Sequence, residues 1–469
     1  MASPLPMGPG FVPHMPFSAG DNECEKYFDL FDFGAWERDQ ASTPKHSRKS
    51  SSSSKSSSSS PSSSSSGLSS KSKKRNLQHP EQTAEVRENG ACIKCRIRRV
   101  RCDLRVCAQC KKFEYLCIHE QLSTIGPVFI NIHDKAGERV RRDDLTGRSV
   151  HALVTFSETD ASAPRMRLTI QAYDPEKGSR PNASNCAIPR EHIPTWDSLV
   201  QWAGEQILFE DKTPFLKAVE TFIMTYSGRG NEGSQLPKFG LVNRVRQLTC
   251  MFKIWMTQHS SSGHSNGIYY YRPPKNDTVR LPFAVHEELR HIAKKAMESL
   301  ERDILSELDA CMTQSKAVQP FEKPLLWVCL WQLLFVYRQL LGSNLPHAGS
   351  HRCREVTRRL YTALVAYYTG FFHTPKSLNL ELDLSRTRMP QDLRHRMAVL
   401  FQNILDTRVG FYQVMQGSKN EFDTLISSTI VENELKKLLK RRSRKSKSSR
   451  STKSSDSRDD YDDDDEEDY

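Results

Sequence analysis

Apolar residues recur every three or four positions along the second half of the chain, the period that brings them to one face of a helix. In two segments these residues are Leu241, Val245, Leu248, Phe252 and Trp255, and then Leu289, Ile292, Ala296, Leu300, Ile304 and Leu308. Thr213 and Pro214 are suited to the N-cap and first position of another helix. Further helices are predicted at 324–341, 351–371, 390–415 and 421–440. The pattern predicts one all-α domain over 191–440, with these stripes as its core.

The most apolar stretch of the chain is "PLLWVCLWQLLFVY", residues 324–337. It is shorter than the roughly 20 residues that a membrane-spanning helix needs, and it carries Gln332. We therefore predict a buried core helix, which ends at the C-capping residue Gly342, and no membrane partner.

Short β-rich runs precede this helical domain. "PVFINI", "SVHALVTF" and "MRLTIQAY" lie between residues 127 and 173 and are separated by Gly, Asp and Pro. They predict a small β-rich module within a linker at 123–190. Because 118–190 has no sustained heptads, a homodimer would have to form through the helical domain.

Both ends of the chain are predicted to be disordered, and only 37% of all residues are hydrophobic. Residues 42–84 are a Ser/Lys-rich linker, and 441–469 form a basic and then acidic tail. In residues 1–41 acidic and apolar side chains alternate, as in activation segments that dock on a coactivator or on the transcription machinery. The alternative is a tail that packs on its own domain. The apolar members are Phe28, Leu30, Phe31, Phe33 and Trp36.

The net charge of +12 favours an anionic partner, such as nucleic acid or a membrane surface. No secretory signal peptide opens the chain, so the cysteines of an intracellular protein are expected to be thiols or metal ligands. Two basic tracts, "KSKKR" at 71–75 and "KKLLKRRSRKSK" at 436–447, are candidate nuclear-import signals. The alternative is solvated or phosphate-binding tails.

Two cysteine-rich stretches share one spacing, in which two residues and then six separate the cysteines. They are "CIKCRIRRVRC" at 92–102 and "CAQCKKFEYLC" at 107–117. Zinc takes four thiolates in a tetrahedron, so six cysteines complete two sites if two of them bridge. Three alternatives stay open: a disulfide scaffold, two separate sites with added ligands such as His119, and a structural zinc module that binds protein.

The spacing resembles the signature of the fungal binuclear zinc-cluster transcription factors, over about 26 residues. The matching residues are Cys92, Cys95, Cys102, Cys107, Cys110 and Cys117. The resemblance implies a module at 85–122 that holds two zinc ions, bridged by Cys92 and Cys107. Cys95 and Cys102 would complete one site and Cys110 and Cys117 the other.

One departure from the family lies between the halves, where the loop Asp103–Val106 is shorter than usual and has no proline. The five steps from Cys102 to Cys107 can still span about 17 Å, so the cluster can close.

Only the first half is rich in arginine, with Arg96, Arg98, Arg99 and Arg101. By the resemblance, Arg98 and Arg99 reach base edges, and Arg96 and Arg101 meet phosphates. Since arginine can donate two hydrogen bonds to guanine, the expected target is a G/C-rich, CGG-like triplet. Phe113, Tyr115 and Leu116 of the second half would pack beneath this helix. The alternative is that the arginines only offset the cluster's charge of about −2, which they exceed.

The fold class predicted is therefore mainly α, with a binuclear zinc module, a helical domain, disordered ends and a small β-rich insert. The expected function is a nuclear, sequence-specific DNA-binding regulator of RNA polymerase II genes. The alternative is a zinc-scaffolded or chromatin-associated adaptor with weak or no sequence-specific binding.

An enzyme is not expected, because the sequence has no P-loop, nucleophile elbow or dinucleotide fingerprint. In "HEELRH", His286 and His291 are five residues apart, about 140° around a helix, so they cannot share a metal. We expect them to be solvated or capping. The remaining thiols of the helical part are expected to be buried, namely Cys186, Cys250, Cys311, Cys329 and Cys353.

Overall fold

A computed structural model gives the fold of most of the chain after residue 89. By its contacts the chain divides into two units, Met1–Arg75 and Asn76–Tyr469, and every residue described below lies in the second. The structure describes residues 90–103, 107–132, 145, 147–172, 186–228, 235–257, 267–272, 277–313, 318–343, 351–385 and 387–438. The predicted activation segment, the serine-rich linker, the first basic tract and the charged tail from 441 lie outside the described residues.

The described part of the chain is mostly helical, which confirms the predicted class at that level. The main helices are α6 Trp196–Phe209, α7 Pro214–Ser227, α8 Phe239–Trp255, α9 Phe283–Thr313, α10 Lys323–Gly342, α11 His351–Phe371, α12 Gln391–Gln416 and α13 Glu421–Ile426. The short ones are α4 Ile93–Arg98, α5 Leu122–Ile125 and the 3-10 turns η1 Glu114–Leu116, η2 Phe129–Asn131, η5 Arg190–His192 and η7 Pro320–Glu322. After α13 the helix continues through the π turn η8, Ser427–Val431, to residue 438.

The helices predicted from the apolar stripes are confirmed, and the stripes of α8 and α9 are buried. Helix α7 begins at Pro214 after the N-cap Thr213, and α11 spans the predicted 351–371. Gly342 is the last residue of α10 rather than its cap, and Ser343 holds the C-cap position.

Helix α10 lies in the core, and Trp327 and Trp331 are fully buried there. Their rings pack edge-on against Phe215 of α7, at centroid distances of 6.1 and 5.5 Å. By length and composition the span Pro320–Gly342 could cross a membrane, but 78% of its most apolar window is buried inside the protein. In this fold α10 is the central core helix that the sequence predicts.

Two of the three β-rich runs supply β1 and β2 of a five-stranded antiparallel sheet, which has the order β3-β2-β1-β4-β5. Its strands are β1 Ser149–Thr155, β2 Met166–Ala172, β3 Cys186–Ala187, β4 Tyr269–Arg272 and β5 Asp277–Arg280. Residue Val150 pairs with Ile170 on one side of β1, and Val154 pairs with Tyr270 on the other. Phe156, directly after β1, stacks on Trp202 of α6 with ring centroids 4.1 Å apart, so the sheet packs against the helices.

Two sequence predictions are corrected here. The run 127–132 was expected to be a strand, but it contains η2, and Phe129 packs between Phe252 and Tyr337 of the helices. The region 191–440 was expected to be all-α, but it supplies β4 and β5 to the sheet. A buried side chain stabilises the core whichever backbone carries it, so a short apolar run did not decide between strand and turn.

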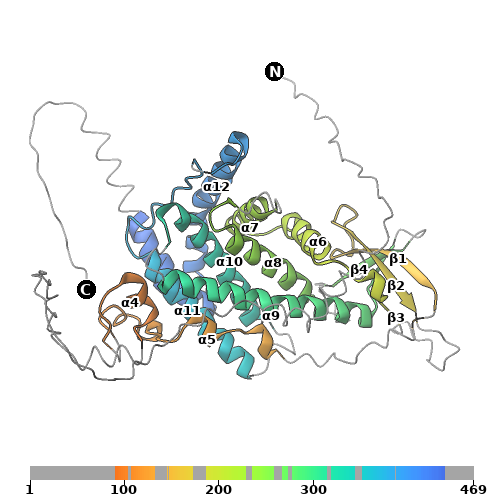
Figure 1. The fold of residues 1–469 in the computed structure, drawn as a ribbon, viewed down its shortest axis with the longest axis horizontal. Helices are drawn as coiled ribbons and strands as arrows, with labels where there is room; N and C mark the ends of the chain where they lie inside the picture. The colour runs from red at the N-terminus through yellow and green to blue at the C-terminus, as the bar shows by residue number, and fades with distance from the viewer. Residues whose placement is uncertain are drawn as a thin grey trace, which may run out of the picture. The chain divides into compact units, whose positions relative to one another are not determined.

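Helix α9 connects the sheet with the cysteine-rich segment, and Figure 1 shows it running between them. Three of its carboxylates accept backbone N–H groups of the preceding chain. Glu288 binds Ile188 next to β3, at 3.1 Å. Glu301 binds Phe129 at 3.0 Å, and Asp309 binds the N–H groups of Leu122 and Ser123 at 2.9 Å. The chain that follows the cysteines is thereby fastened to the helical core.

The carboxyl of Glu301 makes the stability of the folded chain depend on pH. Complete burial raises the pKa of its carboxyl to about 7, although Tyr337 donates to it at 2.6 Å. The folded chain thus binds this proton more tightly than the unfolded chain, whose pKa is near 4.5. Stability is therefore lost as the pH rises from the unfolded value through about 7.

Glu301→Gln keeps a hydrogen-bond acceptor but cannot ionise. In the wild-type chain the free energy of unfolding should fall by at most about 1.4 kcal/mol per pH unit between 4.5 and about 7 because of Glu301, and we expect the substitution to remove this decline. Urea unfolding of both proteins at several pH values between 4.5 and 7 measures this. Parallel profiles for the two proteins would contradict the assignment.

Candidate metal centre and nucleic-acid interface

The backbone folds both cysteine-rich halves back on themselves. Helix α4 begins after Cys92 and ends when Arg99 adopts a left-handed conformation, with φ 56°. The reversal lets the N–H of Val100 donate to the carbonyl of Cys95 at 3.1 Å and returns the chain toward Cys102. In the second half a turn joins Cys107 to Cys110, and η1 leads into Cys117.

The six cysteines form two overlapping groups of four. One contains Cys92, Cys95, Cys102 and Cys107, and the other contains Cys92, Cys107, Cys110 and Cys117. Within each group the sulfur atoms all lie within 4.8 Å of one another. Cys92 and Cys107 belong to both groups, and their sulfurs are 3.7 Å apart.

These separations fit a thiolate metal cluster. Four sulfurs that bind one zinc ion at about 2.3 Å in a tetrahedron lie about 3.8 Å from each other. The sulfur of Cys107 is 3.5 Å from that of Cys95 and 3.9 Å from that of Cys117. A disulfide needs about 2.05 Å, and all six thiols are free, so the disulfide alternative does not fit. The cluster could hold a metal ion.

His119, the added ligand of another alternative, belongs to neither group of four. Its Nδ1 forms a hydrogen bond with the carbonyl of Gly90 at 2.9 Å, and its Nε2 is 3.7 Å from the sulfur of Cys117. The shared pair Cys92 and Cys107 makes an extra ligand unnecessary.

The thiols influence one another's ionisation. Burial, and then the charge of neighbouring thiolates, raises the pKa of Cys102 to about 12 and that of Cys117 to about 11. Six thiols this close can lose their protons together only if cations share the site, which is the condition that metal binding satisfies.

The sulfur atoms form one buried cluster at the centre of this segment. The cluster of buried residues is Cys92, Cys95, Cys102, Cys107 and Cys110, with Ala91 and Cys117 at its edge. So small a core stabilises little by burial alone, so a bound ion would contribute most of the folding free energy.

The four arginines occupy different surroundings. Arg99 and Arg101 are exposed, and Arg101 pairs with Asp103 at 3.6 Å. Arg96 donates to the carbonyls of Ala91 and His119, so it braces the beginning of the segment against its end.

Arg98 is half-buried and donates to the side chain of Gln109 and to the carbonyl of Thr369 on α11, at 2.5 and 3.1 Å. Burial lowers the pKa of its guanidinium. The sequence offered no signal for this last contact, which joins residues 271 positions apart.

The second half was expected to pack Phe113, Tyr115 and Leu116 beneath the first helix. Only Leu116 is fully buried. The exposed fraction of Tyr115 is 51%, and its hydroxyl bonds with Ser428 after α13. The rings of Phe113 and Tyr115 pack against each other at 5.9 Å, at the surface.

Helix α4 packs against α11 of the helical domain. Its Ile97 fills the space above Gly370, where an added Cβ would lie 2.8 Å from Ile97 Cδ1. About three turns earlier on α11, Arg359 pairs with Glu120 at 2.5 Å. The cysteine-rich segment is therefore docked on the helices as well as fastened by α9 (Figure 1).

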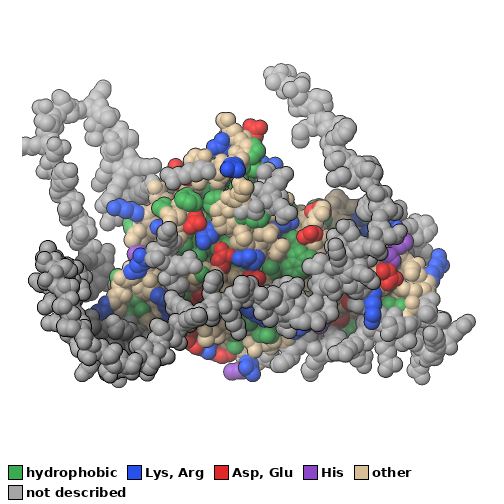
Figure 2. Space-filling model, viewed as in Figure 1, with side chains coloured by type: hydrophobic (Ala, Val, Ile, Leu, Met, Phe, Trp, Pro, Cys, Tyr) green, Lys and Arg blue, Asp and Glu red, His purple; other side chains and the backbone are tan. Residues whose placement is uncertain are grey.

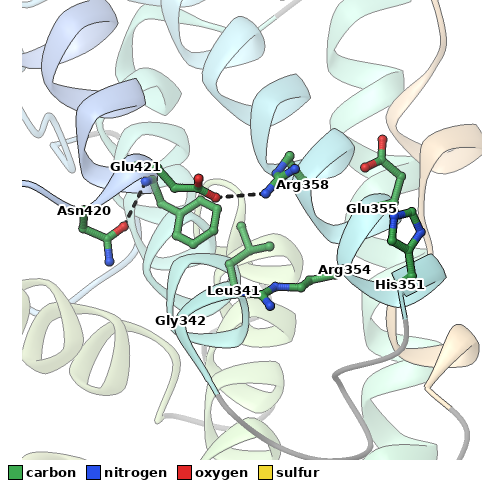
Figure 3. Close-up of a pocket in the computed structure, with 9 residues that line it drawn as sticks. Leu341, Gly342, His351, Arg354, Glu355, Arg358, Asn420 and Glu421 are labelled. Carbon is green, nitrogen blue, oxygen red and sulfur yellow. Dashed lines mark hydrogen bonds and ion pairs between the residues drawn. The ribbon is translucent and has the colours of Figure 1, made fainter.

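A cleft of about 710 Å³ lies at the beginning of α11. Figure 3 shows Arg358 paired with Glu421 there, at 2.9 Å, with His351 and Arg354 nearby. These side chains are exposed, and cations and anions occur together, as they do over the helices on the face drawn in Figure 2. Nothing in this cleft selects one ligand.

The remaining predictions on cysteine and histidine are partly confirmed. Cys186, Cys250, Cys311, Cys329 and Cys353 are all buried. His286 was expected to be solvated or capping, but it is 1% exposed and bonds with the hydroxyl of Thr257 at 3.0 Å. Burial lowers the pKa of its imidazole.

No protein-family model matches the chain, and neither a curated protein nor a solved structure matches it.

Proposed function

We propose that the chain is a nuclear, sequence-specific DNA-binding regulator of RNA polymerase II transcription. Its module would hold two zinc ions and read a G/C-rich, CGG-like triplet in the major groove through α4. The observation that carries this proposal is the pair of four-thiol groups that share Cys92 and Cys107, next to a helix rich in arginine. Thiolate-only sites favour zinc over hard cations such as magnesium or calcium.

The exposed cations supply an electrostatic footprint for DNA. Arg99, Arg101, Lys111 and Lys112 are all exposed on the module. Phosphate contacts from such side chains would position the protein, and base-edge contacts of the α4 arginines would select the sequence. The chain's net charge of +12 favours the same partner.

Other parts of the proposal rest on sequence alone. The N-terminal acidic-aromatic segment would recruit a coactivator or the transcription machinery, and the basic tracts would direct nuclear import. A homodimer would use the helical domain.

The second candidate is a zinc-scaffolded adaptor that binds DNA weakly or without sequence preference. It is favoured by the intramolecular hydrogen bonds that Arg96 and Arg98 donate to backbone carbonyls.

Selection of bound sequences from a pool of random duplexes by the full chain separates the two candidates. A regulator should enrich a short G/C-rich motif, with an affinity at least about 1,000-fold above that for random duplex at physiological salt. An adaptor should enrich no motif at any salt concentration. That result, from protein that retains its zinc, would refute the proposed function.

A further inference from the structure

The helix proposed to read DNA is packed on another part of the same chain. We propose that the face of α11 around Thr369 and Gly370 is a docking surface for α4. Duplex DNA would then compete with α11 for binding to α4. The inference rests on the proposed function. It adds an autoinhibitory contact that holds the module in a state of low DNA affinity.

The contact uses Arg98, one of the two arginines assigned to base reading. Arg98 Nη2 donates to the carbonyl of Thr369, and Nη1 donates to Gln109. Ile97, on the same helix, lies against Gly370. A major groove admits a helix only if the side chains that face the bases are uncovered. While α4 is docked, Arg98 cannot reach a base edge.

The thiolates of the cluster favour the charged form of Arg98, and they stay with α4 if it leaves α11. The α11 side of the contact, in contrast, compensates little of the charge of Arg98. The two hydrogen-bond partners of Arg98 are neutral oxygens, and its Nε is buried without an acceptor among the described residues. His373 and Lys437, which lie close enough to interact with it, are basic as well. Guanine would offer Arg98 two acceptors, O6 and N7, for a bidentate pair, and phosphate would offer an anionic acceptor, whereas Thr369 offers a single carbonyl. DNA can therefore displace α11.

Shape complementarity and one ion pair favour docking instead. Gly370 is the residue that allows Ile97 to approach α11, since any Cβ there would come within 2.8 Å of Ile97 Cδ1 and 3.3 Å of Ile97 Cβ. The Arg359–Glu120 pair lies about three turns away along α11, and both of its side chains are about half exposed, so it adds little alone. Neither of these two interactions involves a thiol of the cluster.

The test compares Gly370→Leu with Gly410→Leu in the full chain loaded with zinc. Gly410 is a helical glycine of α12 with nothing within 4 Å of an added Cβ, so it controls for helix propensity and added bulk. Hydrogen exchange at residues 93–98 and 366–371 reports undocking. Fluorescence anisotropy with a short duplex that carries one CGG triplet, and with a scrambled duplex, reports binding.

We expect Gly370→Leu to speed hydrogen exchange in both segments and to raise the affinity for the CGG duplex about tenfold or more. A tenfold gain corresponds to a wild-type chain in which α4 is docked on α11 in about nine of ten molecules, because only the undocked tenth would bind DNA. Gly410→Leu should behave as wild type. By reciprocity, adding the CGG duplex to the wild-type chain should speed exchange in 366–371. If exchange is unchanged in Gly370→Leu, the measurement is repeated after Arg359→Glu is added, with Glu120→Arg as the rescue.

Faster exchange with unchanged or lower affinity for the CGG duplex would overturn the autoinhibitory contact and leave the proposed function standing. Unchanged exchange in the combined variant would overturn it as well, because the contact would not be separable. If neither wild type nor an undocked variant distinguishes the two duplexes, the proposed function fails, and the inference fails with it.

Discussion

Cys92→Ala is expected to weaken the binding of both zinc ions by the full chain, whereas Cys95→Ala should weaken the binding of one. Cys92 belongs to both four-thiol groups and Cys95 to only one. Structural zinc supplies on the order of 10–16 kcal/mol in small modules, so this is the largest effect that we predict. The measurement is zinc released to a colorimetric chelator, at a concentration that leaves the wild-type chain loaded. Cys107→Ala should repeat the result of Cys92→Ala.

Cys329→Ala is the matched control, because that thiol is fully buried in α10 and belongs to neither group. It should cost stability through the cavity but release no zinc. Complete chelation of the wild-type chain should abolish the ordered module and leave the larger helical core folded. A stoichiometry of one ion, or a module that keeps its structure after chelation, would contradict the binuclear assignment.

Arg99→Ala is expected to cost about 1–3 kcal/mol on the selected duplex and to flatten the discrimination between that duplex and its triplet mutants. Arg99 is an exposed member of the pair assigned to base edges. Arg101→Ala, also exposed, should instead weaken binding to all duplexes alike and reduce the salt slope by about 0.9, because one phosphate is no longer neutralised. Titrations at several salt concentrations measure both quantities.

Two other substitutions need separate interpretation. Arg98→Ala would remove a proposed base contact but also a hydrogen bond between α4 and α11, so we expect a smaller loss of affinity than of specificity. Arg96→Ala removes the brace between Ala91 and His119, so it should lower zinc retention as well as DNA affinity. Equal losses for every sequence in all four variants would reduce α4 to an electrostatic patch and favour the adaptor.

Part of this fold was predictable because its information is local. The stripe of α9 repeats over a helix of 31 residues, and each apolar position reinforces the others. The apolar stretch 324–337 of α10 predicted a core helix because it is too short for a membrane span and carries Gln332. The grouping of the six thiols followed from their spacing and from the family resemblance, because a tetrahedral metal accepts a fixed number of ligands.

The sequence by itself therefore determined the helices that carry the apolar stripes, the strands β1 and β2 and the cysteine set. Only the tertiary structure decided which segments complete the sheet, since β4 pairs with β1 although the two strands are far apart in the sequence. It also decided that Phe129 belongs to a turn held by Glu301, and that Arg98 faces α11 rather than solvent. These outcomes depend on contacts between distant residues, whose free energies are absent from any local pattern of polar and apolar positions.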